Sequence, residues 1–91
     1  MPSIFLKAPD ATLDYAFDWR EWLEDGESIS AYSIKISDTS LVNSNDNQSN
    51  GVVTVWLSGG EAGKTYLVTC NITTSYNRTD ERTMTIMVEE R

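Results

Sequence analysis

GKTYLVTCNITTSYNRTDERTMTIMV, from Gly63 to Val88, decides the fold. Apolar and polar residues alternate along both halves of this stretch, and a short polar segment separates the halves. Such alternation over about four to eight residues is typical of a strand with one buried face, and Thr, Val, Ile and Tyr pack well on a pleated sheet. We therefore predict an antiparallel hairpin that pairs 64–74 with 81–89. Its core-facing residues are predicted to be Tyr66, Val68, Ile72, Met84 and Ile86.

Three further stretches, 13–19, 29–37 and 52–58, alternate in the same way and are predicted to be strands. Their residues on one face are Leu13, Tyr15, Phe17, Trp19, Tyr32, Ile34, Ile36, Val53, Val55 and Leu57. Asp18 and Glu21 form a capping pattern that predicts one helical turn, and Asp25-Gly26 ends it. Trp19 is expected to fill the core.

The segment 37–51 is rich in Asn, Ser, Asp and Gly, which are turn residues. We predict a solvated loop, with at most a very short strand at Leu41 and Val42. Alternate asparagines in this segment suggest a calcium loop. That reading fails because the first position lacks Asp, the sixth lacks Gly, and Thr54 stands where the bidentate Glu belongs.

The N-terminal segment holds one apolar cluster, Ile4, Phe5 and Leu6, between Pro2 and Pro9. Prolines at both ends confine a strand to a few residues at a sheet edge. Two interpretations stay open: a first strand that closes the core, or an arm that docks on a neighbouring subunit. We predict that residues 1–12 form this arm or edge strand and that 13–91 form a single sandwich domain.

Composition limits the function classes. The 91 residues suffice for one domain, and 14 Asp and Glu against 7 Lys and Arg give a net charge of −7. Such a surface repels phosphate backbones and anionic membranes, so we predict no nucleic-acid or membrane partner. The absence of His removes the commonest acid–base group and metal ligand. We therefore expect no enzyme activity, no metal and no cofactor.

Two further features, the run 59–65 and Cys70, resemble functional sites but lack residues that such sites need. Residues 59–65 end in Gly-Lys-Thr, but the glycine spacing of a P-loop is short by one residue, and a strand pattern follows where a helix is required. We predict a glycine-rich turn. Cys70 has no cysteine partner and no basic neighbour to activate it, so we predict a buried, unreactive thiol.

No stretch approaches the roughly 18 apolar residues of a membrane span. The first ten residues lack the basic and long apolar regions of a signal peptide. We therefore expect synthesis in a cytoplasm.

Aromatic residues outside the predicted core are candidates for an interface. Trp56 stands opposite the aliphatic face of 52–58, and Trp22 follows Trp19 in the predicted turn. An outer Trp in a small domain needs cover from a loop or a partner. The predicted protein-interface residues are Ile4, Phe5, Leu6, Trp22 and Trp56. Arg78, Asp80, Glu81 and Arg82 are expected to pair locally at the surface.

Six to seven short strands with turn signals about every ten residues favour an all-β sandwich. The Gly-x-x-Tyr-x-Val-x-Cys run from Gly63 to Cys70 resembles the penultimate strand of PKD-like and other immunoglobulin-like domains. That resemblance implies an immunoglobulin-like β-sandwich, with a small barrel as the second choice.

A second resemblance rests on three stretches in order: LDYAFDWREWLEDGESI from Leu13, VWLSGGEAGKTY from Val55 and NITTSYNRTDERTMTIMVE from Asn71. Together they resemble the short bacteriophage proteins called fibre–tail adaptors. The resemblance covers most of residues 9–90 and weakens over 37–51. It implies a non-enzymatic virion component, multimeric within the particle, that binds tail, head–tail connector or fibre proteins.

Two alternatives remain. One is a capsid decoration or cement protein bound to the major capsid protein, which copy number per particle would distinguish from an adaptor. The other is a carbohydrate-binding module, which would need Trp22, Trp56 and Tyr76 to be exposed and coplanar. Asp14 and Asp18 share a strand face, but without His or another partner they suit turns and caps better than catalysis.

Overall fold

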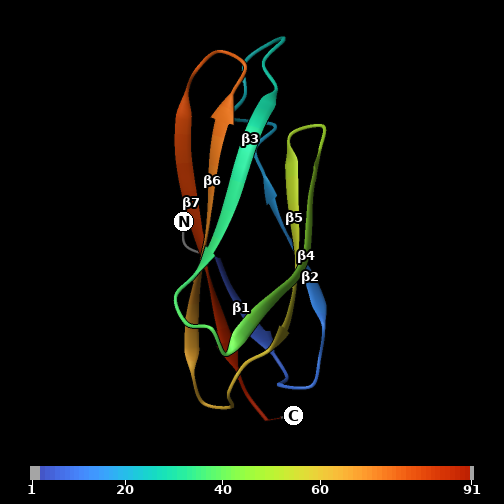
Figure 1. Cartoon of the computed structure of the whole chain (residues 1–91), viewed down its shortest axis with the longest axis vertical. Helices are drawn as coiled ribbons and strands as arrows, with labels where there is room; N and C mark the ends of the chain where they lie inside the picture. Colours follow the sequence, from blue (N-terminus) through green and yellow to red (C-terminus); the bar gives the residue numbers. More distant parts are fainter. Residues whose placement is uncertain (1–2, 91) are drawn as a thin grey trace.

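Two β-sheets face each other in the computed structural model, which describes residues 3–90 (Figure 1). The strands are β1 (Ser3–Lys7), β2 (Leu13–Asp18), β3 (Ile29–Ile36), β4 (Leu41–Ser49), β5 (Val52–Gly59), β6 (Thr65–Thr74) and β7 (Thr79–Val88). One sheet has the order β1-β7-β6-β3 and the other the order β2-β5-β4. This division of strands is that of an immunoglobulin-like sandwich. The predicted all-β fold of six to seven strands is confirmed.

The predicted hairpin of 64–74 with 81–89 is formed by β6 and β7. They pair antiparallel from Thr65 opposite Met87 to Thr73 opposite Thr79. The five predicted core residues of this hairpin are all buried. Tyr66 also fastens the start of β6, because its hydroxyl accepts the Glu61 N–H at 2.9 Å and lies 2.6 Å from the Ser40 hydroxyl. A tyrosine that bonds to backbone a few residues upstream at this corner is a recurrent feature of immunoglobulin-like domains.

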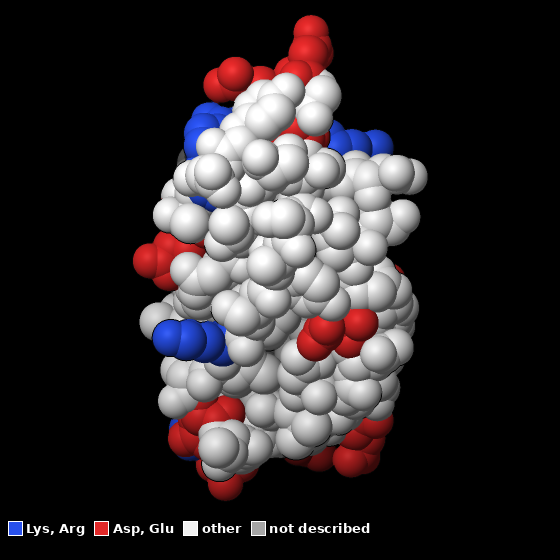
Figure 2. Space-filling view, turned by 45° about the horizontal axis from the view of Figure 1, so that its top comes forward, with Lys and Arg blue, Asp and Glu red and all other residues white. Residues whose placement is uncertain are grey.

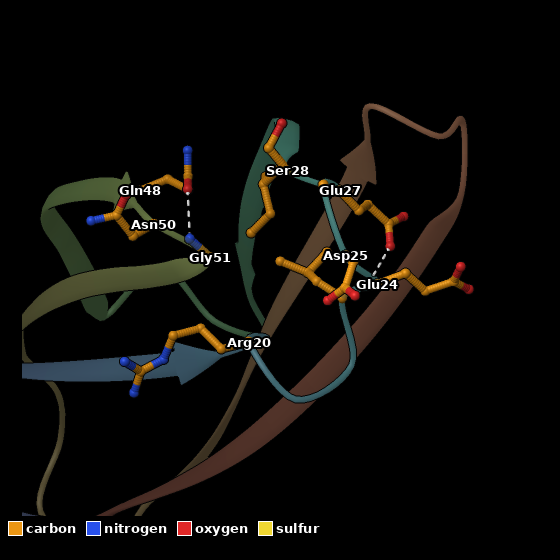
Figure 3. Close-up of a pocket in the computed structure, with 11 residues that line it drawn as sticks. Arg20, Glu24, Asp25, Glu27, Ser28, Gln48, Asn50 and Gly51 are labelled. Atoms are coloured by element: carbon orange, nitrogen blue, oxygen red, sulfur yellow. Dashed lines mark hydrogen bonds between the residues drawn. The ribbon is translucent and has the colours of Figure 1, made fainter.

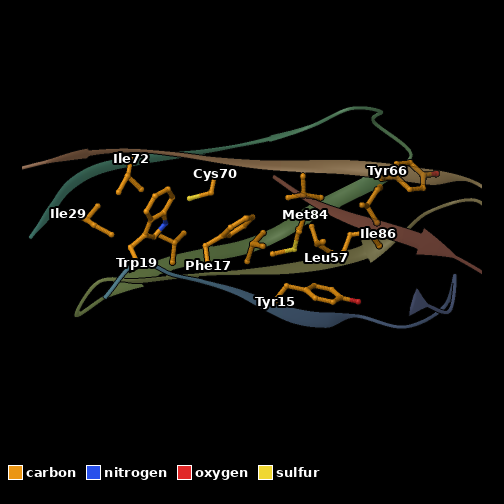
Figure 4. Close-up of a cluster of buried hydrophobic side chains, with 14 of the residues drawn as sticks. Tyr15, Phe17, Trp19, Ile29, Leu57, Tyr66, Cys70, Ile72, Met84 and Ile86 are labelled. Atoms are coloured by element: carbon orange, nitrogen blue, oxygen red, sulfur yellow. The ribbon is translucent and has the colours of Figure 1, made fainter. Parts of the chain in front are cut away.

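The core lies between the sheets and is filled from both (Figure 4). Val53, Val55 and Leu57 of β5 are buried, and Trp19, just after β2, has no exposed surface, which confirms it as a core residue. Leu13 is an exception to the predicted inward face. It is exposed because it begins β2, an edge strand that covers only part of the core.

The segment 41–49 corrects the prediction of a solvated loop. It forms β4, which pairs antiparallel with β5 and has an irregular register between Asn43 and Asn45. Asn50 and Gly51 join the two strands, and both have positive φ angles, 51° and 85°. An Asn-Gly pair is suited to such a two-residue hairpin turn. Backbone pairing, and not apolar side chains, therefore makes this segment a strand.

The segment after β2 makes a single turn. The N–H groups of Trp22 and Leu23 both donate to the Trp19 carbonyl, each at 3.0 Å, and Asp18 Oδ1 accepts the Arg20 N–H at 3.0 Å. The predicted helical turn is thus one hydrogen-bonded turn. Residues 3–90 contain no helix long and apolar enough to cross a bilayer.

β1 occupies one edge of the four-stranded sheet and runs parallel to β7, from Ser3 opposite Met84 to Lys7 opposite Val88. Lys7 has no exposed surface, and its Nζ donates to the carbonyls of Gly59 at 2.6 Å and Ala8 at 2.8 Å. Burial lowers the pKa of this ammonium group. The end of β1 is therefore fastened to the end of β5. The division into 1–12 and 13–91 stays a prediction, and residues 1 and 2 lie outside the described part.

Candidate docking surfaces

The apolar cluster of the N-terminal segment is divided between two faces of β1. Because β1 pairs in register with β7, Ile4 lies beside Thr85 and Leu6 beside Met87, on the outer face of the sheet. Phe5 lies beside Ile86 and points inward. All three side chains remain exposed, Ile4 the most at 61%. β1 thus lies at the edge of the core, and its three apolar side chains remain exposed to solvent.

An outer patch extends from β1 across β7 to β6. We define it by Ile4, Leu6, Leu67 and Met87. The register places Leu67 beside Thr85, so Ile4 and Leu67 flank the same β7 residue from its two sides. Ile4, Leu6 and Leu67 are each about half exposed or more, at 61%, 48% and 50%. Contiguous exposed apolar residues are typical of interaction sites.

The gap between the two sheets at the β1–β2 side is closed by aromatic rings. The rings of Phe5 and Tyr15 have centroids 5.1 Å apart and are tilted by 58°. The Tyr15 hydroxyl is buried without a hydrogen-bond partner among the described residues. Burial, followed by the nearby Asp14 charge, raises the pKa of Tyr15. Leu13, at the start of β2, adds a further exposed apolar side chain.

Trp22 lies at the opposite end of the molecule and is half-buried. Its ring meets Trp19 edge-on, with centroids 5.4 Å apart, and the Arg78 guanidinium lies 4.0 Å from its ring centre. Arg78 in turn pairs with Glu27, whose side chain has no exposed surface. The hydrogen bonds from Arg78 hold the pKa of Glu27 at about 2. Arg78 therefore covers one face of the half-buried Trp22 ring, and that face is not free for a sugar.

The basic residues of the last hairpin bind the loop after β2, which corrects the expected local pairing. Arg82 lies 4.2 Å from the Trp19 ring centre and donates to the Asp18 carbonyl at 2.8 Å. Arg78 donates to Glu27, which lies just before β3, at 2.9 Å. The sequence signal for these contacts is weak, because Arg–Trp stacking joins residues about 60 positions apart and depends on the strand pairing.

Trp56 is half-buried on the outer face of the β2-β5-β4 sheet, between Asp14 of β2 and Asn45 of β4. The predicted alternation of 52–58 is therefore confirmed. The five predicted interface residues do not form one surface: three lie on β1, Trp22 lies at one end, and Trp56 lies on the second sheet. Leu67 and Met87 were missed because only the register of β1 on β7 brings them beside Ile4 and Leu6.

An open hollow of about 570 Å³ lies at the end that carries the β4–β5 turn (Figure 3). Its lining is polar and includes Arg20, Glu24, Asp25, Gln48 and Asn50. The side-chain oxygen of Gln48 accepts a hydrogen bond from the Gly51 N–H at 3.2 Å. Within residues 3–90, no group of three or more His, Cys, Asp or Glu side chains is placed to hold a metal ion. We therefore describe the hollow as an open gap between the loop after β2 and the β4–β5 turn, and not as a ligand pocket.

Charge is distributed unevenly over the surface. On the face shown in Figure 2, many Asp and Glu side chains lie towards the two ends, and the broad uncharged area between them is interrupted by a few acidic and basic groups. At the β5–β6 end, Lys64 pairs with Asp38 at 2.6 Å, and these bonds hold the pKa of Asp38 at about 2. A surface with a net charge of −7 and large uncharged areas suits protein contacts better than contacts with phosphates.

The fold is that of an immunoglobulin-like domain, and a solved structure supports this class. The solution structure of the PKD domain from KIAA 1837 protein superposes with a TM-score of 0.55 at 18% identity, over 100% of this chain and 83% of that one. Residues 7–87 match the family described as podophage GP4 fiber-tail adaptor protein gp77. The chain belongs to this family, which confirms the resemblance found in its sequence. No curated protein matches the chain.

Membership of the family makes the chain a component of the phage virion with a structural adaptor role. The partners that follow from that role are other tail or fibre proteins of the particle.

Proposed function

We propose that the chain is a non-enzymatic structural protein that links tail or head–tail components to fibres. It is made in the cytoplasm of the host and is multimeric within the particle. The observation that carries the proposal is the β1–β2 side, defined by Ile4, Phe5, Leu6 and Leu13. These four side chains are 37–61% exposed beside a free strand edge. Apolar side chains beside such an edge provide both contact area and backbone groups for docking.

The rest of the molecule supports the proposal by providing a rigid frame. The loop after β2 is fastened to the last hairpin by the Glu27–Arg78 pair and by the bond from the Tyr76 hydroxyl to the Asp25 carbonyl at 2.5 Å. The opposite end is fastened by Lys7 and Lys64. A frame held at both ends keeps its surfaces fixed, which lowers the entropy lost on binding.

The test replaces exposed apolar residues and follows two properties, melting of the isolated chain and its incorporation into particles. Ile4→Ser combined with Leu6→Ser keeps the buried Lys7 and should leave melting nearly unchanged. Incorporation should fall, because a few anchors carry most of an interface's energy, about 2 kcal/mol or more each. Trp56→Ser is measured separately, as a test of the outer face of the second sheet.

The control is Val42→Ser, because Val42 is as exposed as Leu6, 47% against 48%, but lies on β4. Normal incorporation of every variant would contradict docking through these residues. Counting copies of the chain per particle separates an adaptor from a cement protein. A small ring at one vertex indicates an adaptor, whereas a copy for every capsid subunit indicates a cement protein.

A further inference from the structure

We propose that the free edge of β1 is a strand-addition site, and that it takes an extended segment of another virion protein as an additional, antiparallel strand. The segment would alternate apolar with polar residues and carry Lys or Arg at its N-terminal end. This inference rests on the proposed adaptor function and names how that function is carried out.

The four free edges of the sandwich differ in their protection. β2 carries the exposed Asp14 and Asp18. β3 carries the exposed Lys35 and an irregular register at its start, and β4 has an irregular register between Asn43 and Asn45. Charges and bulges of this kind prevent strands of other chains from pairing with an edge.

β1 lacks this protection. Its sequence is Ser-Ile-Phe-Leu-Lys, and its one charged residue, Lys7, is turned inward and buried. The exposed residues Ile4, Phe5 and Leu6 are all apolar. Among the edges formed by residues 3–90, β1 alone offers an apolar strand with neither an exposed charge nor an irregular register. Such an edge is a template for pairing unless a partner covers it.

The backbone of β1 directs free hydrogen-bonding groups to the outside. The Lys7 carbonyl accepts the Glu89 N–H at 3.0 Å, so the backbone of Lys7 is turned towards β7. Because these groups alternate in direction along a parallel ladder, Phe5 also bonds to β7, and the N–H and C=O groups of Ile4 and Leu6 point to the free edge. Two donors and two acceptors are thus presented in the spacing of a strand.

The side chains of β1 indicate what an added strand would contact. On the outer face its apolar residues would lie beside Ile4 and Leu6 and would extend the outer patch by one strand, about 4.8 Å away. On the inner face it would cover the exposed edge of Phe5 above Tyr15. An antiparallel arrangement is favoured because its ladder is slightly more stable per residue than a parallel one.

The acidic residues near the end of β1 indicate which kind of segment would pair with its free edge. Asp10 and Glu89 are both exposed at the Lys7 end of β1: Asp10 follows Lys7 by three residues, and the Glu89 N–H donates to the Lys7 carbonyl. A strand antiparallel to β1 begins at this end, so a basic residue at its start would face these carboxylates. A second copy of the chain is disfavoured, because each copy carries a net charge of −7.

Hydrogen exchange tests the backbone pairing directly. Exchange of the Ile4 and Leu6 amides is measured in the isolated chain and in purified particles. We expect it to slow by about tenfold or more in particles, because an added strand would bond these groups. Absence of the chain from particles would overturn the proposed function itself. A chain present in particles with unprotected Ile4 and Leu6 amides would overturn the strand addition alone.

Proline variants provide a matched pair, since the two neighbouring N–H groups point in opposite directions. Leu6→Pro removes an outward donor and should keep the melting temperature within a few degrees while incorporation falls by about tenfold. Phe5→Pro removes a donor to β7 and should lower the melting temperature. If Leu6→Pro is incorporated normally, the strand addition is wrong. If it does not fold, Ile4→Lys with Leu6→Lys replaces it, with the same expected and contradicting outcomes.

The nature of the occupant has its own test. Asp10→Lys combined with Glu89→Lys should reduce incorporation by about fivefold or more through repulsion of the basic segment. Unchanged incorporation would overturn the basic end of the partner. Sedimentation of the isolated wild-type chain should show a monomer. A dimer that Leu6→Pro abolishes would show that a second copy occupies the edge, which would overturn the partner proposed.

Discussion

Cys70 shows how burial decides the behaviour of a single residue. Its side chain has no exposed surface, and burial raises the pKa of its thiol to about 11. We expect no reaction with a thiol reagent in the folded chain and full reaction in denaturant, which serves as the control. Cys70→Ala should cost on the order of 1 kcal/mol through lost packing and leave particle assembly intact. Rapid labelling of the folded chain would contradict this burial.

Gly51, in the β4–β5 turn, packs against the loop after β2, and its carbonyl accepts the Trp19 N–H at 2.9 Å. Gly51 has a φ angle of 85°, and an added Cβ would lie 3.0 Å from Leu23 Cδ1 and 3.2 Å from Arg20 Cγ. Gly63 has nearly the same φ angle, 84°, with no atom within 4 Å of an added Cβ. The two glycines therefore separate backbone strain from steric contact.

We expect Gly63→Ala to cost about 1 kcal/mol, the strain of a left-handed alanine. Gly51→Ala should cost more, because it adds crowding against Leu23 and Arg20. Denaturant unfolding of both variants measures the two costs. Equal costs would mean that the loop after β2 moves aside freely and does not hold the turn.

The elements with alternating side chains could be predicted from the sequence, and those held by the backbone could not. The pattern of 64–74 and 81–89 placed Tyr66, Val68 and Met84 in the core, where the structure has them. β4 was missed because its side chains carry no apolar alternation: of its nine residues, only Leu41 is buried. The Asn50-Gly51 pair before a strand was the available signal.

The candidate surfaces were less predictable than the fold. The sequence identified Ile4, Phe5 and Leu6 from the two prolines around them, but not their partition between two faces. Leu67 and Met87 join the outer patch only through the parallel register of β1 on β7, a pairing between the two ends of the chain. Periodicity within one segment cannot reveal which distant segment lies beside it.

At the scale of the whole molecule, carboxylates at both ends couple stability to pH. Hydrogen bonds from Arg20, Arg78 and Lys64 hold the pKa values of Asp18, Glu27 and Asp38, respectively, at about 2. Each folded pKa is lower than the ordinary value, so the stabilisation is present at neutral pH and is lost as the pH falls from about 4.5 through about 2. The melting temperature should therefore fall as the pH is lowered through this window.

Glu27→Gln should lower the melting temperature at neutral pH and make it less sensitive to acid, because this variant has one fewer titrating group. Glu24→Gln is the control: its carboxylate lies 3.6 Å from the same Arg78 but is 66% exposed, so the variant should keep the acid sensitivity of the wild type. An unchanged acid sensitivity in Glu27→Gln would mean that the enclosed pair does not contribute to the coupling.

The parallel pairing of β1 with β7 has a consequence for the order of folding. Ser3 lies opposite Met84 and Lys7 opposite Val88, so this contact closes a loop of about 80 residues. During synthesis, β1 leaves the ribosome long before β7, so it has no partner strand until β7 has emerged. Contacts of such long sequence separation form late. The edge of β1 is therefore set in place only after β7 has joined the fold, so a nascent chain without β7 would lack the proposed docking edge.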